Sequence, residues 1–198
     1  MIPALLACAA AFGALLWQVM AGGTLVVLDG RVNAWLLPLR HRGLLIAFGW
    51  LTGAGEGVTA AAVGVSASGL LWAGGRAGLV MPFWVTLIGA EATTWSVKFL
   101  VARVRPPFLE GVTAASPSFP SAHATVSLAV YGFLALAVAD GVAPEHRTAV
   151  FAAAALLILL IMFSRVFLSV HYLSDVLGGA VVAAFWLVIG WGLLHGPR

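Results

Sequence analysis

Long runs without charged residues alternate with short polar connections along this chain. Six such runs cover residues 1–28, 43–75 (interrupted by Glu56), 77–97 (interrupted by Glu91), 124–139, 148–164 and 176–194. Most approach the roughly 20 residues with which a helix crosses about 30 Å of hydrocarbon. A β-barrel would instead show segments of about 10 residues that alternate apolar and polar. The pattern therefore predicts an all-α integral membrane protein with a bundle of six transmembrane helices.

The composition agrees with this prediction. Hydrophobic residues make up 62% of the chain and charged residues 9%, and the mean hydropathy is +1.07. A soluble domain of this size needs more charge to cover its surface. The connections are too short to hold a second folded unit, so we expect residues 1–198 to form one membrane-embedded domain. The first run lacks the basic leader of a signal peptide, so we expect it to be a retained span.

The charge and the cysteine content argue against a nucleic-acid partner and against a disulfide. The net charge of +3 is scattered, without the basic cluster of a nucleic-acid-binding protein, so we expect no nucleic-acid partner. Cys8 is the only cysteine, which excludes a disulfide within the chain. The many Gly and Ala residues favour close helix packing, but they leave the oligomeric state open.

Six crossings place the first, third and fifth connections on one face of the membrane. The arginines on that face are Arg31, Arg40, Arg42, Arg103, Arg105 and Arg165, against Arg76, Arg147 and Arg198 on the other. By this count the positive-inside rule puts the odd connections in the cytoplasm. Without Arg105 and Arg165, which are candidate site residues, the tally is four against three. The sequence alone leaves the orientation open.

The first connection, from Asp29 to Gly43, has an amphipathic pattern. Its apolar residues recur at helical spacing between arginines, and they are Val32, Trp35, Leu36 and Leu39. This spacing predicts a short helix that lies in the membrane interface. A loop with an aromatic anchor fits the same residues.

The few charged residues gather in the third and fifth connections. Lys98 and Arg105 are seven residues apart, close to two helical turns, so they would project from one face of a helix. Pro106 and Pro107 would end that helix. Two neighbouring cations favour an anion site, although both side chains could instead snorkel to the lipid headgroups.

The third connection ends in the residues SFPSAH, just before the fourth run. A helix that starts here has unpaired N–H groups, so Ser121 can serve as its N-cap while those N–H groups bind an anion. Taken singly, Ser121 is explained as a cap and His123 as an incidental interfacial histidine. Next to two cations, a helix start predicts a phosphate site.

The fifth connection carries Arg165, His171 and Asp175. His171 and Asp175 are four residues apart, so the carboxylate can accept the imidazole N–H, fix its tautomer and raise its basicity. The other ring nitrogen is then a good nucleophile. The alternative is a polar pair that stabilises a helix start. Because connections three and five share a face of the membrane, these groups can converge on one site. Without such a site, each of the three groups of polar residues would need its own structural explanation.

The segments VKFLVARVRPP, SFPSAH and SRVFLSVHYLSD resemble the three signature motifs of the type 2 phosphatidic acid phosphatase (PAP2) family. This family comprises membrane lipid phosphatases related to vanadium haloperoxidases, and the resemblance implies a six-helix bundle of that type. The spacings of the first and third motifs match in full. In the second motif, Ala122 stands where the family usually has glycine, which allows an anion to approach the backbone N–H closely.

The resemblance also implies a role for each site residue. His171 would attack phosphorus to form a phosphohistidine, Asp175 would orient it, and His123 would protonate the departing oxygen. The phosphoryl oxygens would be held by Lys98, Arg105, the Ser121 hydroxyl, the Ala122 N–H and Arg165. Water would then hydrolyse the phosphoenzyme, with His123 as the base. No metal or cofactor is implied, because side-chain cations take the role that magnesium has elsewhere.

We therefore expect a lipid phosphatase in a bacterial inner membrane, with its site facing the periplasm or exterior. Its substrate would be a lipid phosphate or diphosphate from the bilayer, and undecaprenyl diphosphate is our first expectation. Phosphatidylglycerol phosphate and phosphatidic acid are alternatives, because the motifs bind phosphate and do not define the lipid. Other interpretations are a lipid phosphotransferase and a catalytically silent phospholipid-binding protein. The chain shows neither a repeated half nor a broken helix pair, which disfavours a transporter.

Overall fold

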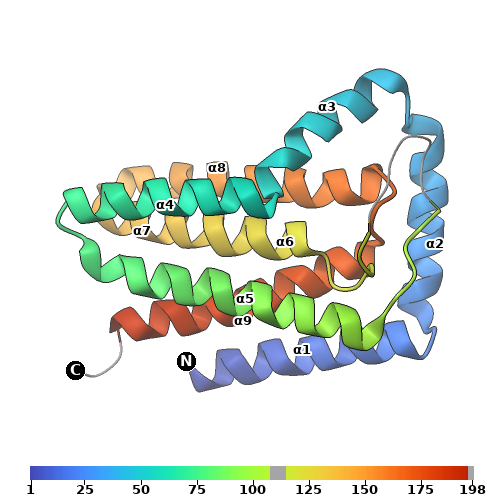
Figure 1. The fold of residues 1–198 in the computed structure, drawn as a ribbon, viewed down its shortest axis with the longest axis horizontal. Coiled ribbons are helices and arrows are strands. Elements are labelled where there is room, and N and C mark those ends of the chain that lie inside the picture. The colour runs from blue at the N-terminus through green and yellow to red at the C-terminus, as the bar shows by residue number, and fades with distance from the viewer. Residues whose placement is uncertain (108–114, 196–198) are drawn as a thin grey trace.

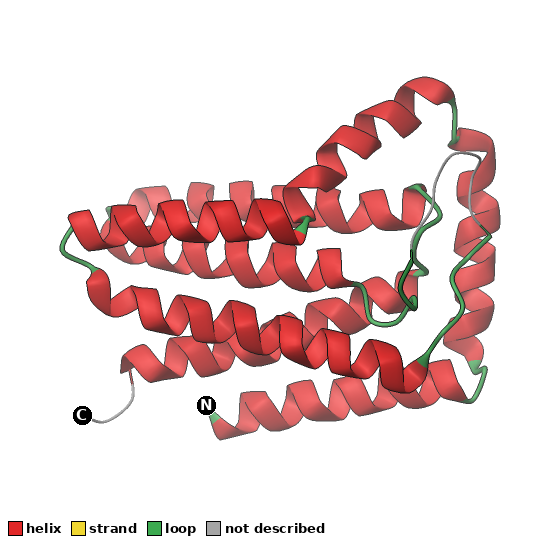
Figure 2. Cartoon of the chain, viewed as in Figure 1, coloured by secondary structure: helices red, strands yellow, loops and turns green. Residues whose placement is uncertain are grey.

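The computed structural model describes residues 1–107 and 115–195, and their regular structure is helical throughout (Figures 1 and 2). The α-helices are α1 (Ile2–Met20), α2 (Thr24–Leu36), α3 (Arg42–Thr52), α4 (Gly57–Ala73), α5 (Val80–Val101), α6 (Ala122–Ser127), α7 (Phe133–Gly141), α8 (Pro144–Phe167) and α9 (Leu173–His195). Short 3-10 turns cover Leu37–Leu39, Gly53–Gly55 and Ala77–Leu79, and a π-helical turn, Leu128–Gly132, joins α6 to α7.

The described residues contain five or six candidate membrane spans by length and composition, in agreement with the predicted helical membrane bundle. Five stretches of helix are long and apolar enough to cross a bilayer, and they run over Ile2–Met20, Ala77–Val101, Ala122–Gly141, Pro144–Phe167 and Leu173–Leu194. The sixth candidate is the pair α3 and α4, which passes the same test only when both helices are taken together and is bent by 49° at Glu56. The expectation of unbroken helices was therefore wrong at this point. The turn at Gly53–Gly55 breaks the helix, and Glu56 is extended with φ −75° and ψ 148°.

The first span is shorter than the charge-free run suggested. It ends at Met20 rather than near residue 28, because the chain turns at Gly22, which has φ +62°. A new helix, α2, starts at Thr24 and lies across one end of the bundle, transverse to α1, α5, α8 and α9 (Figure 1). The predicted helix in the first connection is thus confirmed, although it begins earlier than Asp29. Asp29 and Leu36 are buried against the bundle, whereas Trp35 is 69% exposed.

Small residues allow the central helices to pack closely. α9 runs beside α1, α5 and α6. A Cβ atom on Gly89 of α5 would lie 2.4 Å from the Trp186 ring of α9. A Cβ on Gly190 of α9 would lie 2.0 Å from the Thr86 hydroxyl oxygen. Glycine at both contacts lets the two helices approach, as the composition predicted for a membrane bundle.

The odd-numbered connections meet at one end of the bundle, as the count of crossings predicted. Figure 1 shows α2, the loop between α5 and α6 and the turn between α8 and α9 at this end. The start of α1, the end of α9 and the α4–α5 and α7–α8 connections lie at the other end. Part of the third connection, residues 108–114, lies outside the described residues, as does Arg198 from the arginine count.

Candidate active site

The start of α6 and the start of α9 are joined through their backbones. The amide N–H of Ser121 donates to the carbonyl oxygen of Asp175 at 2.9 Å, and the Thr125 hydroxyl donates to the carbonyl oxygen of Gly179 at 3.2 Å. A Cβ on Gly179 would lie 2.5 Å from the Ser121 carbonyl oxygen, so only glycine permits this approach. The second and third motifs are thereby fixed next to each other.

His171 and Asp175 form the predicted pair. The distance from His171 Nδ1 to Asp175 Oδ2 is 3.4 Å, and the two side chains are 2% and 0% exposed. Asp175 Oδ2 also accepts hydrogen bonds from the backbone N–H of Tyr172, at 2.8 Å, and from the Ser118 hydroxyl. Because the ionised carboxylate accepts hydrogen bonds only, this network assigns the imidazole proton to Nδ1 and the lone pair to Nε2.

The first motif supplies two cations, but not from one helix face. α5 ends at Val101, where Ala102 takes the left-handed conformation with φ +48°. The expectation that Lys98 and Arg105 share a helix face is therefore wrong, since Arg105 reaches the site from the following loop. Its Nη1 lies 3.2 Å from His171 Nε2 and donates to the Val170 carbonyl oxygen at 2.5 Å.

Lys98 and Ser121 lie at the same place, fully or almost fully buried. Lys98 Nζ donates to the Pro117 carbonyl oxygen at 2.6 Å, which excludes the alternative that this side chain snorkels to the headgroups. Ser121 is the N-cap of α6, and its hydroxyl oxygen accepts from the Ala124 N–H at 3.5 Å. Ala122, the first residue of α6, is half-buried. The predicted cap is thus present, and the Ser121 and Ala122 positions line the same corner of the site.

Arg165 and His123 complete the cluster and carry unpaired polar atoms. Arg165 Nη1 donates to the Thr52 hydroxyl at 2.6 Å, while Arg165 Nε and His123 Nε2 are buried without a hydrogen-bond partner among the described residues. The His123 ring packs at the bend of the broken span, 3.3 Å from where a Cβ on Gly55 would lie. Buried polar atoms normally have partners, so these two are suited to receive the oxygens of a bound ligand.

The charge of the cluster suits an anion. The positive charges of Arg165, Arg105 and Lys98 act on His123. The positive charge of the cluster comes from Lys98, Arg105 and Arg165. Among the residues that the structure describes, no group of three or more His, Cys, Asp or Glu side chains is arranged to hold a metal ion. An oxyanion with several acceptor oxygens, such as phosphate, matches these donors.

Burial sets the protonation state of His171. It lowers the pKa of the imidazole to about 3 from the ordinary 6.5, and Arg105 and Arg165 act in the same direction, whereas Asp175 opposes the shift. His171 is therefore neutral near pH 7, as a nucleophile must be.

This shift predicts how stability depends on pH. In the window from about 6.5 down to about 3 the unfolded chain protonates this histidine and the native protein does not. The free energy of unfolding therefore falls as the pH falls, by about 1.4 kcal/mol for each pH unit in that window. We expect the thermal midpoint of the detergent-solubilised protein to drop between pH 7.5 and 5.5 more steeply than that of a His171→Asn variant. Parallel curves would show that His171 titrates normally in the native protein.

Three residues near the site were not among the candidates from the sequence, and they are Ser118, Arg103 and Asp29. Ser118 belongs to the second motif, but its buried hydroxyl contacts Asp175 rather than solvent. Arg103 Nη1 donates to Asp175 Oδ1 at 2.5 Å, and its Nη2 donates to Asp29 Oδ2 at 2.8 Å. The sequence held one sign of Arg103 and Asp29: charged residues are few in this chain, and each ionised group in a membrane protein needs a partner.

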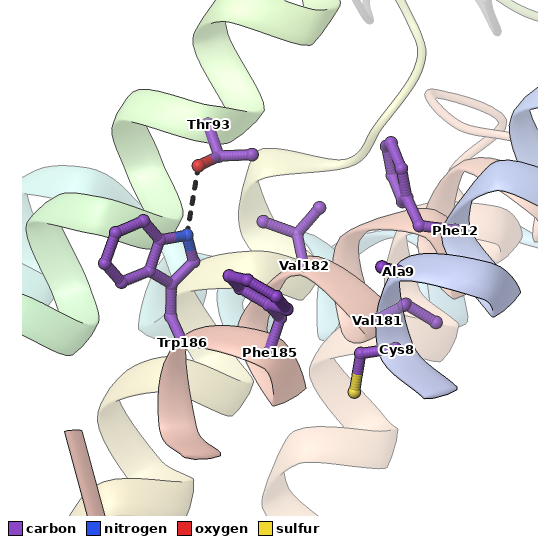
Figure 3. Close-up of a pocket in the computed structure, with 8 residues that line it drawn as sticks. All are labelled: Cys8, Ala9, Phe12, Thr93, Val181, Val182, Phe185 and Trp186. Atoms are coloured by element: carbon purple, nitrogen blue, oxygen red, sulfur yellow. Dashed lines mark hydrogen bonds between the residues drawn. The ribbon is translucent and has the colours of Figure 1, made fainter. Parts of the chain in front are cut away.

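A pocket elsewhere in the bundle is unsuited to phosphate. Figure 3 shows it between α1, α5 and α9, and its lining residues are Cys8, Ala9, Phe12, Thr93, Val181, Val182, Phe185 and Trp186. The Trp186 indole N–H donates to the Thr93 hydroxyl at 3.0 Å. The lining contains no charged side chain, and the free Cys8 is partly buried in it.

Comparisons with known proteins agree with the fold and the motifs. The family model described as PAP2 superfamily matches residues 79–196, more than half of the chain. Phosphatidylglycerophosphatase B of Bacillus subtilis (strain 168) is 35% identical over 99 residues, which cover 48% of this chain and 49% of that protein. The match thus spans about half the length of that relative.

Two crystal structures have a similar fold. A transmembrane PAP2-type phosphatidylglycerolphosphate phosphatase from Bacillus subtilis superposes with a TM-score of 0.83 at 22% identity, over 96% of this chain and 97% of that one. Aquifex aeolicus LpxE superposes with a TM-score of 0.64 at 21% identity, over 84% of this chain and 93% of that one. At such identities the likeness concerns the fold alone.

Proposed function

This chain belongs to the PAP2 superfamily, and on that premise we propose that it hydrolyses a phosphate monoester of a membrane lipid through a phosphohistidine at His171. The observation that carries the proposal is the state of His171. Its Nδ1 is engaged by Asp175, and its Nε2 lone pair points to the guanidinium of Arg105, 3.2 Å away. A neutral imidazole that faces a cation is ready to attack a bound phosphoryl group.

In the first half-reaction, His171 Nε2 forms a bond to phosphorus while the bond from phosphorus to the lipid oxygen breaks. His123, which is protonated when the anionic phosphate is bound, donates its proton to that departing oxygen, which leaves as an alcohol, and His123 becomes neutral. The non-bridging oxygens are held by Arg105, Arg165 and Lys98. Arg105 and Lys98 would exchange some of their backbone carbonyl partners for phosphate, and Arg165 would offer its unpaired Nε. Asp175 balances the positive charge that the phosphorylated imidazole acquires.

In the second half-reaction, water attacks phosphorus and gives up a proton to His123. The bond from His171 to phosphorus breaks, the electron pair returns to Nε2, and inorganic phosphate leaves. Both histidines are then in their starting states, so the cycle needs no further reactant. In this proposal water accepts the phosphoryl group, whereas in a phosphotransferase the hydroxyl of a second molecule would accept it.

We propose phosphatidylglycerol phosphate as the substrate, in place of our first expectation, undecaprenyl diphosphate. The support is the relative phosphatidylglycerophosphatase B, whose name specifies this class of lipid. The five or six candidate spans among the described residues indicate a membrane protein. We further propose that this is a bacterial inner membrane and that the site faces its outer side, where the lipid enters laterally from the bilayer.

The substrate proposal is tested with detergent-purified protein and excess chelator. Inorganic phosphate release is measured on phosphatidylglycerol phosphate, phosphatidic acid and undecaprenyl diphosphate. We expect kcat/KM to be about tenfold or more higher for phosphatidylglycerol phosphate, within the range that differences in substrate contacts produce. Chelator should leave the rate unchanged. A preference for undecaprenyl diphosphate would restore our first expectation, and dependence on a metal would exclude the mechanism above.

A further inference from the structure

Arg103 connects the carboxylate of Asp175 to a second buried carboxylate on α2. Its Nη1 donates to Asp175 Oδ1 at 2.5 Å, and its Nη2 donates to Asp29 Oδ2 at 2.8 Å. The guanidinium also lies over the Tyr172 ring, 4.4 Å from the ring centroid. With only 11% of its side chain exposed, Arg103 is held from three directions. It binds Asp175 through Oδ1, so that Oδ2 faces His171, Ser118 and the Tyr172 N–H.

Asp29 has a second set of contacts at the start of α9. Its Oδ1 accepts from the backbone N–H of Ser174 at 2.9 Å, and its Oδ2 accepts from the Ser174 hydroxyl at 2.5 Å. The first N–H groups of a helix lack partners within that helix, so Asp29 caps α9 from a different helix. Ser174 directly precedes Asp175. Asp29, whose side chain is fully buried, therefore fixes both the backbone next to Asp175 and the cation bound to it.

The charges of the three groups depend on one another. Asp29, Arg103 and Asp175 together carry a net charge of −1, which faces His171. If Arg103 bound Asp175 alone, its undivided positive charge would cancel the carboxylate and weaken the bond from Asp175 to His171 Nδ1. Asp29 shares Arg103 and so preserves the negative charge where positive charge develops on His171. Burial acts to lower the pKa of Arg103, but the two carboxylates raise it above the ordinary value, so the cation persists.

We propose that Asp29 and Arg103 are positioning residues that act through Asp175 to keep His171 oriented and its phosphorylated form stabilised. The effect of these residues on catalysis rests on the proposed function, in which His171 is the nucleophile. Asp29 belongs to α2, outside residues 79–196 that the family model matches. The helix across the end of the bundle would thus supply part of the active site (Figure 1).

The test compares Asp29→Asn with a matched control. Asparagine keeps the size of the side chain and removes its charge, so kcat for phosphate release should fall roughly 10- to 100-fold, the usual cost of losing a partner that supports a reacting group. KM should change less than about threefold, because Asp29 touches no substrate. Asp140→Asn breaks the Arg76–Asp140 pair at the other end of the bundle and should leave both constants unchanged.

A double variant distinguishes coupling from separate damage. Arg103→Met alone leaves two carboxylates close together without a cation, whereas Asp29→Asn combined with Arg103→Met leaves one. The loss of kcat in the double variant should be smaller than the product of the two single losses, by about threefold or more. Losses that multiply would mean that Asp29 and Arg103 act independently, and a lower thermal midpoint with an unchanged kcat would mean that Asp29 serves folding alone. Either result would overturn the proposal.

A measurement without turnover separates this proposal from the proposed function. In NMR spectra of the ¹⁵N-histidine-labelled protein, with His171 assigned through His171→Asn, we expect the Nδ1-protonated form in the wild type. In Asp29→Asn, we expect a mixture of tautomers. If Asp29→Asn shows this mixture while the wild-type protein releases no phosphate, the positioning role is supported and the proposed function is overturned. An unchanged tautomer in Asp29→Asn, with normal phosphate release, would overturn the positioning role alone.

Discussion

Replacing His171 by asparagine should lower phosphate release by roughly 10⁴-fold or more, as expected when a nucleophile is removed and only binding remains. Asparagine retains an N–H that can donate to Asp175, so the buried carboxylate keeps a partner. Wild-type protein quenched during turnover of a ³²P-labelled lipid should carry label that is lost in acid and retained in base. The variant should carry none.

His146→Asn is the matched control for this experiment. His146 is exposed near the start of α8, at the other end of the bundle, so its replacement should leave release and labelling unchanged. Equal thermal midpoints would show that both variants are folded. A His171→Asn protein that still becomes labelled, or still releases phosphate at the wild-type rate, would transfer the nucleophile to another residue.

The membrane fold was predictable because the bilayer demands continuous apolar helices, and those leave a direct trace in the sequence. Helix ends were less predictable. At Gly22, inside a charge-free run, and at Glu56, which interrupts another run, a local turn changes the direction of the chain, and mean hydropathy does not record it. Ala102 has the same effect after α5, because a left-handed conformation is uncommon for alanine and nothing in the sequence announces it.

The site was predictable where its contacts are local. His171 and Asp175 are four residues apart at a helix start, and Ser121 caps the helix that it precedes. The contact between Arg103 and Asp29, by contrast, joins residues 74 positions apart, and the contact between Ser174 and Asp29 joins residues 145 apart. Such pairs meet only when α2 packs across the bundle, so no spacing rule reveals them.

The roles of the two histidines should separate when the leaving group is changed. If His123 protonates the departing lipid oxygen, His123→Asn should lower kcat on a phospholipid by about 10²- to 10⁴-fold. An aryl phosphate such as p-nitrophenyl phosphate departs as a stable anion and needs little protonation. Formation of the phosphoenzyme from this compound should therefore be almost as fast in the variant as in the wild type.

The second half-reaction should then become the slow step, because His123 is also the base that activates water. We expect His123→Asn to release about one nitrophenol per site in a burst, followed by slow turnover, while phosphoenzyme accumulates on His171. Stopped-flow absorbance gives the burst, and label retained after a quench in alkaline detergent gives the phosphoenzyme. The burst should vanish in the double variant with His171→Asn, since no nucleophile remains. Equal losses on the lipid and the aryl phosphate, without a burst, would mean that His123 binds phosphate and transfers no proton.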